Sequence, residues 1–172
     1  MVDITHKNWP TFSMVQIHGS GAEDPDWEGP DLMIEAPAEM VGYRYEAADA
    51  LTKVSGTGHG GFVRFGSNGV FGSTLLNTVT GEVVQHVPGA DQLRLMNSSL
   101  PAFTEIVRAF FERFPFYGSD SDESEFKTAA ADVERIVREI DPSAFIQDGF
   151  WATLVDDINM GDFSTEEIIE TE

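Results

Sequence analysis

Residues 62–96 decide the fold class, and they read FVRFGSNGVFGSTLLNTVTGEVVQHVPGADQLRLM. β-Branched and aromatic residues occur there in short runs separated by turn residues, which predicts a series of strands. The predicted strands span 62–65, 70–78, 82–87 and 92–96. Asn68-Gly69 indicates a type I′ hairpin turn, because both residues tolerate a positive φ, and Thr80-Gly81 indicates a second tight turn. Neighbouring strands with such short links predict an antiparallel meander, not βαβ units.

The chain after residue 97 is predicted to be helical, because its apolar residues recur with the 3.6-residue period of a helix. The predicted helices span 99–114, 126–140 and 149–159. Ser98 or Ser99 is expected to cap the first helix. The second is expected to end at Asp141-Pro142, because a residue before proline avoids helical geometry, and the third at Gly161. We therefore expect an α+β fold, a mostly antiparallel mixed sheet flanked by helices, with the first helix on one face of the sheet.

The chain of 172 residues, 41% of them hydrophobic, is long enough for one domain with a packed core. We expect residues 1–172 to form a single domain. Gly and Pro interrupt residues 1–55, the least readable part, where alternating residues predict only a short strand at 13–18. Residues 161–172 are rich in Glu and are expected to form an acidic tail.

The formal charge of the chain is −20, from 30 acidic and 10 basic residues. A field of this sign repels phosphate backbones and anionic lipids, so nucleic acids and membrane surfaces are not expected partners. The acidity fits two alternatives: solubility or adaptation to a salty cytoplasm, or a surface that attracts a basic protein. The chain has no cysteine, no 18-residue apolar run and no basic start followed by an apolar stretch, so we expect a cytoplasmic protein.

No pattern of catalytic, cofactor-binding or metal-binding residues is recognisable. The histidines His6, His18, His59 and His86 lack the spacing of zinc ligands. The acidic stretch 120–125 lacks the central glycine of a calcium loop, and no GxSxG nucleophile motif occurs. We therefore expect no enzyme activity, no metal and no cofactor.

The unusual features that remain are an acidic stretch predicted to be an exposed loop, 118–125, and aromatic residues near loop edges. Aromatic residues rimmed by acids are typical of protein-binding surfaces, and equally of residues packed at the edge of a core. The acidic loop could alternatively only improve solubility. The candidate partner-binding residues are Asp120, Asp122, Glu123, Glu125, Trp27 and Tyr117.

Several short motifs over residues 60–160 follow a known family pattern. Thr80-Gly81-Glu82-Val83 lies in a predicted strand pair, and a strand leads into the segment that carries the other motifs. The motif residues are Asn97, Ser98, Ser99, Phe103, Asp141, Pro142, Phe150 and Trp151. With these motifs the sequence resembles the SUKH-4 family of bacterial immunity proteins, part of the Smi1/Knr4-like superfamily. Residues 1–55 diverge, because they lack the usual N-terminal helix of that family with Leu-Pro at its start.

The resemblance implies an immunity protein that binds and neutralises a cognate toxin, such as a nuclease or a nucleic-acid deaminase, in a bacterial polymorphic toxin system. Because a nuclease is basic where it meets phosphate, an acidic inhibitor is electrostatically suitable. The alternative is a scaffold module without a toxin partner, since Smi1/Knr4-like domains also serve as interaction hubs. The motif residues are expected to be structural: Asn97 to bond the backbone, and Phe103 and Trp151 to anchor helices on the core.

Overall fold

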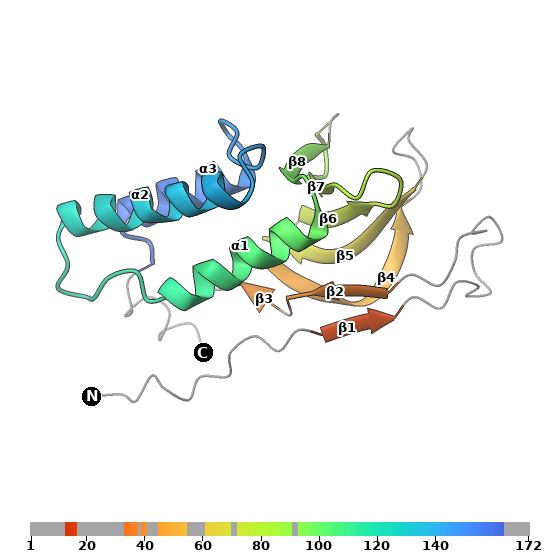
Figure 1. Cartoon of the computed structure of the whole chain (residues 1–172), viewed down its shortest axis with the longest axis horizontal. Helices are drawn as coiled ribbons and strands as arrows, with labels where there is room; N and C mark the ends of the chain where they lie inside the picture. Colours follow the sequence, from red (N-terminus) through yellow and green to blue (C-terminus); the bar gives the residue numbers. More distant parts are fainter. Residues whose placement is uncertain are drawn as a thin grey trace.

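Six antiparallel strands form the main sheet of the computed structural model, and three helices lie on one side of it, with α1 (Leu100–Arg113) nearest the sheet (Figure 1). The structure describes residues 13–16, 33–37, 39–40, 45–54, 61–69, 72–90 and 93–163. The strands are β3 (Glu39–Met40), β4 (Tyr45–Val54), β5 (Phe62–Asn68), β6 (Gly72–Asn77), β7 (Val83–His86) and β8 (Arg94–Asn97). Their order in the sheet is their order in the chain. The predicted meander and the single α+β domain are therefore confirmed.

The N-terminal part contains strands that the sequence did not reveal. β1 (Ser13–Gln16) and β2 (Met33–Ala36) form a separate antiparallel pair, which confirms the strand predicted at 13–18 over its described residues. β3 and β4 were not predicted. β4 reads YEAADALTKV, in which Ala, Glu and Leu favour helix, and its register with β5 shifts between Ala47 and Thr52. This irregularity breaks the two-residue alternation that indicates a strand.

The two predicted turns differ in outcome. Asn68 belongs to β5 and pairs with Gly72, the first residue of β6. Three residues therefore connect the two strands, and the predicted two-residue turn at Asn68-Gly69 is wrong. Gly69 has the positive φ of 60° that the sequence led us to expect. The turn between β6 and β7 is confirmed: Gly81 has φ 80°, and Asn77 Oδ1 accepts hydrogen bonds from two turn amides at 3.0 and 3.2 Å.

The helices are α1 (Leu100–Arg113), α2 (Glu123–Ile140) and α3 (Phe150–Met160). Ser99, not Ser98, caps α1, since its Oγ accepts a hydrogen bond from the amide of Ala102 at 3.3 Å. Gly161 ends α3 with φ 92°, as predicted. None of the helices among the described residues is long and apolar enough to cross a membrane.

The main core lies between the sheet and the helices. In Figure 1, α1 runs across one face of the sheet, and α2 and α3 lie alongside each other beyond it. Phe103 of α1 is fully buried among aromatic rings, with centroid distances of 5.1 Å to Tyr45 and 6.3 Å to Trp151. Gly66 makes room for one of these rings, because a Cβ there would lie 2.4 Å from Cε2 of Tyr45.

Candidate functional site

The motif residues of β8, α2 and α3 meet in a buried hydrogen-bond network. Trp151 Nε1 donates to Asn97 Oδ1 at 3.1 Å, and Asn97 Nδ2 donates to Asp141 Oδ2 at 3.1 Å. The same Asp141 oxygen accepts from the amide of Ser98 at 2.7 Å, and its Oδ1 accepts from Ser143 Oγ at 2.6 Å. Asn97 and Trp151 are fully buried and Asp141 nearly so. The network therefore joins the last strand to the start of α1, the end of α2 and the start of α3.

The ionised form of Asp141 is favoured in this network. Burial would raise the pKa of Asp141, but hydrogen bonds from Ser143, Ser98 and Asn97 together outweigh it and lower the pKa below its usual range. Asn97 was expected to bond the backbone. Instead its amide links the Asp141 carboxylate to the Trp151 indole, because the side chain points into the core between the strand and the helices.

The other motif residues occupy different environments. Phe103 is fully buried in the core, Phe150 is partly buried, and Pro142 is exposed directly after α2. Four of the eight motif residues, Asn97, Phe103, Asp141 and Trp151, are thus inaccessible to a partner, in keeping with a role in the stability of the fold. A binding surface has to be sought elsewhere.

The acidic stretch is exposed, but it is a loop only in part. α2 begins at Glu123, three residues before the predicted start, because Asp122 caps it. Asp122 Oδ1 accepts hydrogen bonds from the amides of Ser124 at 2.8 Å and Glu125 at 3.2 Å. Glu125 Oε2 accepts in return from the Asp122 amide at 3.0 Å, which completes a capping box. Asp122 and Glu125 therefore stabilise the helix whether or not they meet a partner.

Two carboxylates of this stretch, Asp122 and Glu123, have lowered pKa values. Hydrogen bonds from Ser124 and Glu125 lower the pKa of Asp122. The hydrogen bond and the charge of Lys127, whose Nζ lies 2.6 Å from Glu123 Oε1, lower the pKa of Glu123. All of these side chains are open to solvent, so at neutral pH they present negative charge at the start of α2.

Tyr117 does not belong to the exposed surface, which corrects the prediction that it contacts a partner. Its side chain is buried, its hydroxyl donates to the carbonyl of Ile158 at 3.1 Å and accepts from the amide of Phe163 at 2.9 Å. Its ring packs on Phe126 with centroids 4.5 Å apart. Tyr117 therefore fastens the end of α3 to the start of α2. Trp27, the other aromatic candidate, lies outside the described residues.

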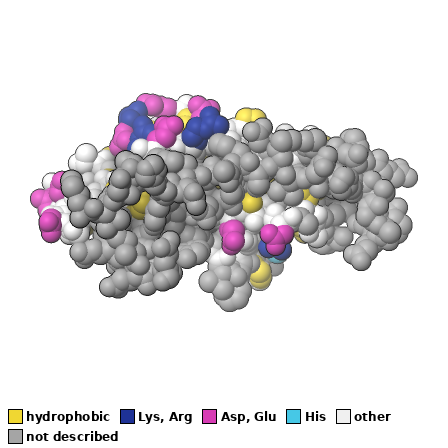
Figure 2. All heavy atoms as spheres, turned by 90° about the horizontal axis from the view of Figure 1, so that it is seen from below, with side chains coloured by type: hydrophobic (Ala, Val, Ile, Leu, Met, Phe, Trp, Pro, Cys, Tyr) yellow, Lys and Arg dark blue, Asp and Glu magenta, His cyan; other side chains and the backbone are white. Residues whose placement is uncertain are grey.

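The end of α3 adds residues to the acidic stretch that the sequence did not group with it. α2 and α3 pack as a hairpin, and a Cβ on Gly161 would lie 2.9 Å from the Phe126 ring. This contact brings the exposed Asp162, and Met160 with 65% of its surface accessible, to the start of α2. We name Asp120, Asp122, Glu123, Glu125 and Asp162 the acidic end. Figure 2 shows carboxylates at its left edge, the end of the molecule where α2 begins in Figure 1.

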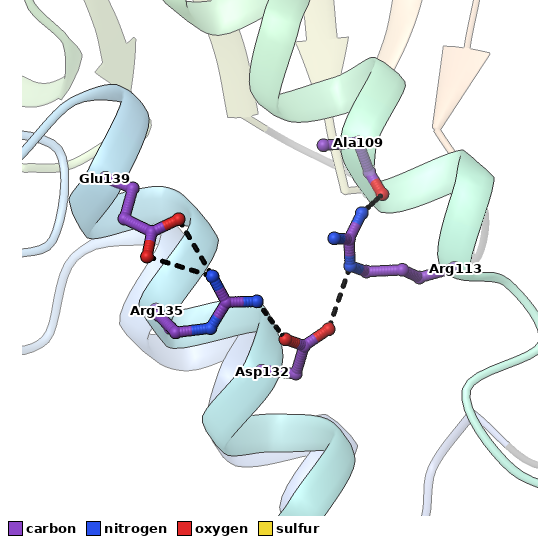
Figure 3. Close-up of polar contacts among 5 residues, drawn as sticks. All are labelled: Ala109, Arg113, Asp132, Arg135 and Glu139. Carbon is purple, nitrogen blue, oxygen red and sulfur yellow. Dashed lines mark hydrogen bonds and ion pairs between the residues drawn. The ribbon is translucent and has the colours of Figure 1, made fainter.

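Basic residues on the helices neutralise a different region, the middle of α2 (Figure 3). Arg113 of α1 donates to Asp132 at 2.9 Å and to the carbonyl of Ala109 at 3.0 Å. Arg135 donates to the other Asp132 oxygen and to both Glu139 oxygens at 2.8 and 2.9 Å. The hydrogen bonds from Arg135 and Arg113 outweigh burial and lower the pKa of Asp132. The network ties α1 to α2 and balances charge there, whereas the acidic end has Lys127 as its paired cation.

Metal-binding geometry is absent from the part of the chain that the structure describes, where no three His, Asp or Glu side chains are placed to hold an ion. His86 ends β7, and His6, His18 and His59 lie outside the described residues.

Comparison with known proteins identifies the family. The model of the SUKH-4 immunity protein family matches residues 30–157, which extends the resemblance to β2, β3 and β4 and covers most of the chain. Searches among curated proteins and among solved structures found no match. The matched range contains the complete Trp151–Asn97–Asp141 network and α2 with its capping box. The chain belongs to the SUKH-4 immunity protein family.

Proposed function

We propose that this protein neutralises a cognate toxin of a polymorphic toxin system by binding it through the acidic end, without catalysing a reaction. Family membership supports the immunity role. Two features of the acidic end support it as the toxin-binding surface: its five carboxylates are exposed, and the exposed Met160 offers apolar contact area beside them. We expect the protein to act in the cytoplasm, where such a toxin reaches its target.

The proposed toxin is basic, such as a nuclease or a nucleic-acid deaminase. Enzymes that act on nucleic acids need Lys and Arg where they contact phosphate. A protein with a charge of −20 attracts such a surface over several ångströms, which accelerates association and excludes the nucleic acid. Asp122 and Glu125 keep their capping role in the bound state, so binding requires no unfolding of α2.

Co-purification with the toxin encoded beside the gene tests the immunity role. We expect a stoichiometric complex in which the activity of the toxin is blocked. Failure of the neighbouring toxin to bind, or full toxin activity within the complex, would leave a scaffold role as the better account.

Two double variants that remove the same charge test whether the acidic end is the toxin-binding surface. Asp120→Asn with Glu125→Gln removes two charges of the acidic end, and Gln at the third helical position retains the capping box. Glu46→Gln with Asp49→Asn removes the same charge from exposed positions of β4. We expect the first pair to weaken toxin binding and the second to leave it unchanged. Equal effects would show that only the net charge matters.

A further inference from the structure

Three large apolar side chains are exposed in the part of the chain that the structure describes: Val79 with 80% of its surface accessible, Met160 with 65% and Ile146 with 39%. Val79 lies in the turn between β6 and β7, and Ile146 in the connection between α2 and α3. Single exposed apolar residues are common on soluble proteins and need no explanation by themselves. Met160 is distinguished by its setting, because it is the one of the three that lies beside the acidic end.

The backbone at Met160 is fixed by the way α3 ends. Gly161 follows Met160 with φ 92°, and its amide donates to the carbonyl of Ile158 at 3.1 Å. The amide of Asp162 donates to the carbonyl of Asp157 at 3.1 Å. These hydrogen bonds from beyond the helix to its last carbonyls close the final turn, so Met160 lies in an ordered helical turn and not in a frayed end.

Contacts from other elements hold the same turn. The Tyr117 hydroxyl donates to the carbonyl of Ile158 before Met160 and accepts from the amide of Phe163 after it, at 3.1 and 2.9 Å. Phe163 is buried, and its ring centroid lies 6.0 Å from that of Phe110. A side chain on a fixed backbone loses less conformational freedom on binding than one on a mobile loop. Met160 is therefore exposed, while the position of its backbone is already set before a partner binds.

Carboxylates border Met160 along the chain and from α2. Asp156 is exposed and lies one turn earlier on the same face of α3, and the exposed Asp162 follows two residues later. The close approach of Gly161 to the Phe126 ring places the start of α2, with its own carboxylates, against this turn. An apolar side chain within a polar rim is the arrangement typical of residues that contribute a large share of the binding energy at protein interfaces.

We propose that Met160 is the apolar anchor of the toxin complex and enters an apolar pocket whose rim carries Lys or Arg side chains. The inference rests on the proposed function and adds a division of roles to it. The carboxylates of the acidic end govern the rate of association, because charges act over a distance. Met160 governs the lifetime of the complex, because removal of apolar surface from water contributes only once the two surfaces are in contact.

The surroundings of Met160 determine the chemistry of this partner. The rim of the pocket is basic, because an acidic rim would bring like charges together beside Asp156 and Asp162. A second copy of the chain is disfavoured at this place for the same reason, since each copy carries a charge of −20. The floor of the pocket is apolar, because the thioether side chain has no hydrogen-bond donor and makes favourable contacts with aromatic rings.

The kinetics of the complex with the toxin encoded beside the gene, measured by biolayer interferometry at about 150 mM salt, test the inference. Met160→Ala should accelerate dissociation by about tenfold or more and change the association rate by less than about twofold. Met160→Leu should restore slow dissociation, to within about threefold of the wild type, because it retains most of the apolar volume. Val79→Ala truncates a similarly exposed apolar residue on the sheet and should leave both rates unchanged. The Tm should be the same for all three variants, because both residues are exposed.

Three results would overturn Met160 as the anchor while leaving toxin binding by the acidic end intact. The first is unchanged dissociation of the Met160→Ala complex. The second is an equal acceleration by Val79→Ala. The third is an equal acceleration by Asp120→Asn with Glu125→Gln, which would mean that the carboxylates hold the complex together. If the wild type forms no complex with the toxin, the proposed function fails and this inference fails with it.

Discussion

Replacing Asn97 with Ala should strongly destabilise the fold, because one amide serves two buried partners. The change leaves the Trp151 indole N–H without an acceptor in a fully buried position, which costs about 1–3 kcal/mol. It also removes a hydrogen bond to the Asp141 carboxylate, worth about 1.5–3 kcal/mol. The free energy of unfolding should therefore fall by about 2.5–6 kcal/mol. For a domain of this size, the expected decrease in Tm is about 5–24 °C.

Urea denaturation of Asn97→Ala, Trp151→Phe and the double variant measures this effect. Trp151→Phe removes the indole donor. The double variant should therefore lose less free energy of unfolding than the sum of the losses of the two single variants. A loss below about 1 kcal/mol for Asn97→Ala, or strictly additive losses, would refute the idea that this network holds β8 and α3 together.

Three further predictions concern the core. Phe103→Ala should lower the free energy of unfolding, measured by urea denaturation, by about 3–5 kcal/mol, because a fully buried ring is lost from the core. An unchanged urea midpoint would contradict the burial of Phe103. Gly66→Ala should lower Tm, since the new Cβ meets the Tyr45 ring at 2.4 Å; a tolerated alanine would argue against this contact. The lowered pKa of Asp141 contributes stability above about pH 4 that is lost as the pH falls through that pKa. The stability difference between the wild type and Asp141→Asn should thus shrink below about pH 4, and a difference independent of pH would contradict an ionised Asp141.

Local patterns in the sequence were sufficient for the elements between residues 62 and 163. The strands of the meander carry β-branched runs bounded by Gly, and the helices carry regular apolar stripes with recognisable caps such as Ser99 and Gly161. β4 was missed because its residues favour helix and its irregular register hides the alternation; it is a strand because it pairs with β3 and β5. The start of α2 was placed too late because its first turn consists of polar and acidic residues.

The candidate sites depended on contacts that no local pattern contains. Asn97 meets Asp141 and Trp151 across 44 and 54 residues, so the motif could be recognised but not its geometry. Tyr117 was a candidate partner contact because it lies near a predicted loop edge, a position equally typical of a residue at the edge of the core, and the end of α3 covers it. Asp162 joins the acidic end through the same packing.

The association rate with the cognate toxin, measured by stopped flow at about 10 mM and 150 mM salt, tests the central claim most directly. Two charges 8 Å apart in water interact by about 0.5 kcal/mol, reduced by screening to about 0.4 and 0.2 kcal/mol at these concentrations. If each lost charge faces one cation in the encounter complex, Asp120→Asn with Glu125→Gln should slow association about fourfold at low salt and about twofold at high salt. Glu46→Gln with Asp49→Asn should slow association less at both salt concentrations. A rate indifferent to salt and to the acidic-end variant would contradict toxin capture by this surface.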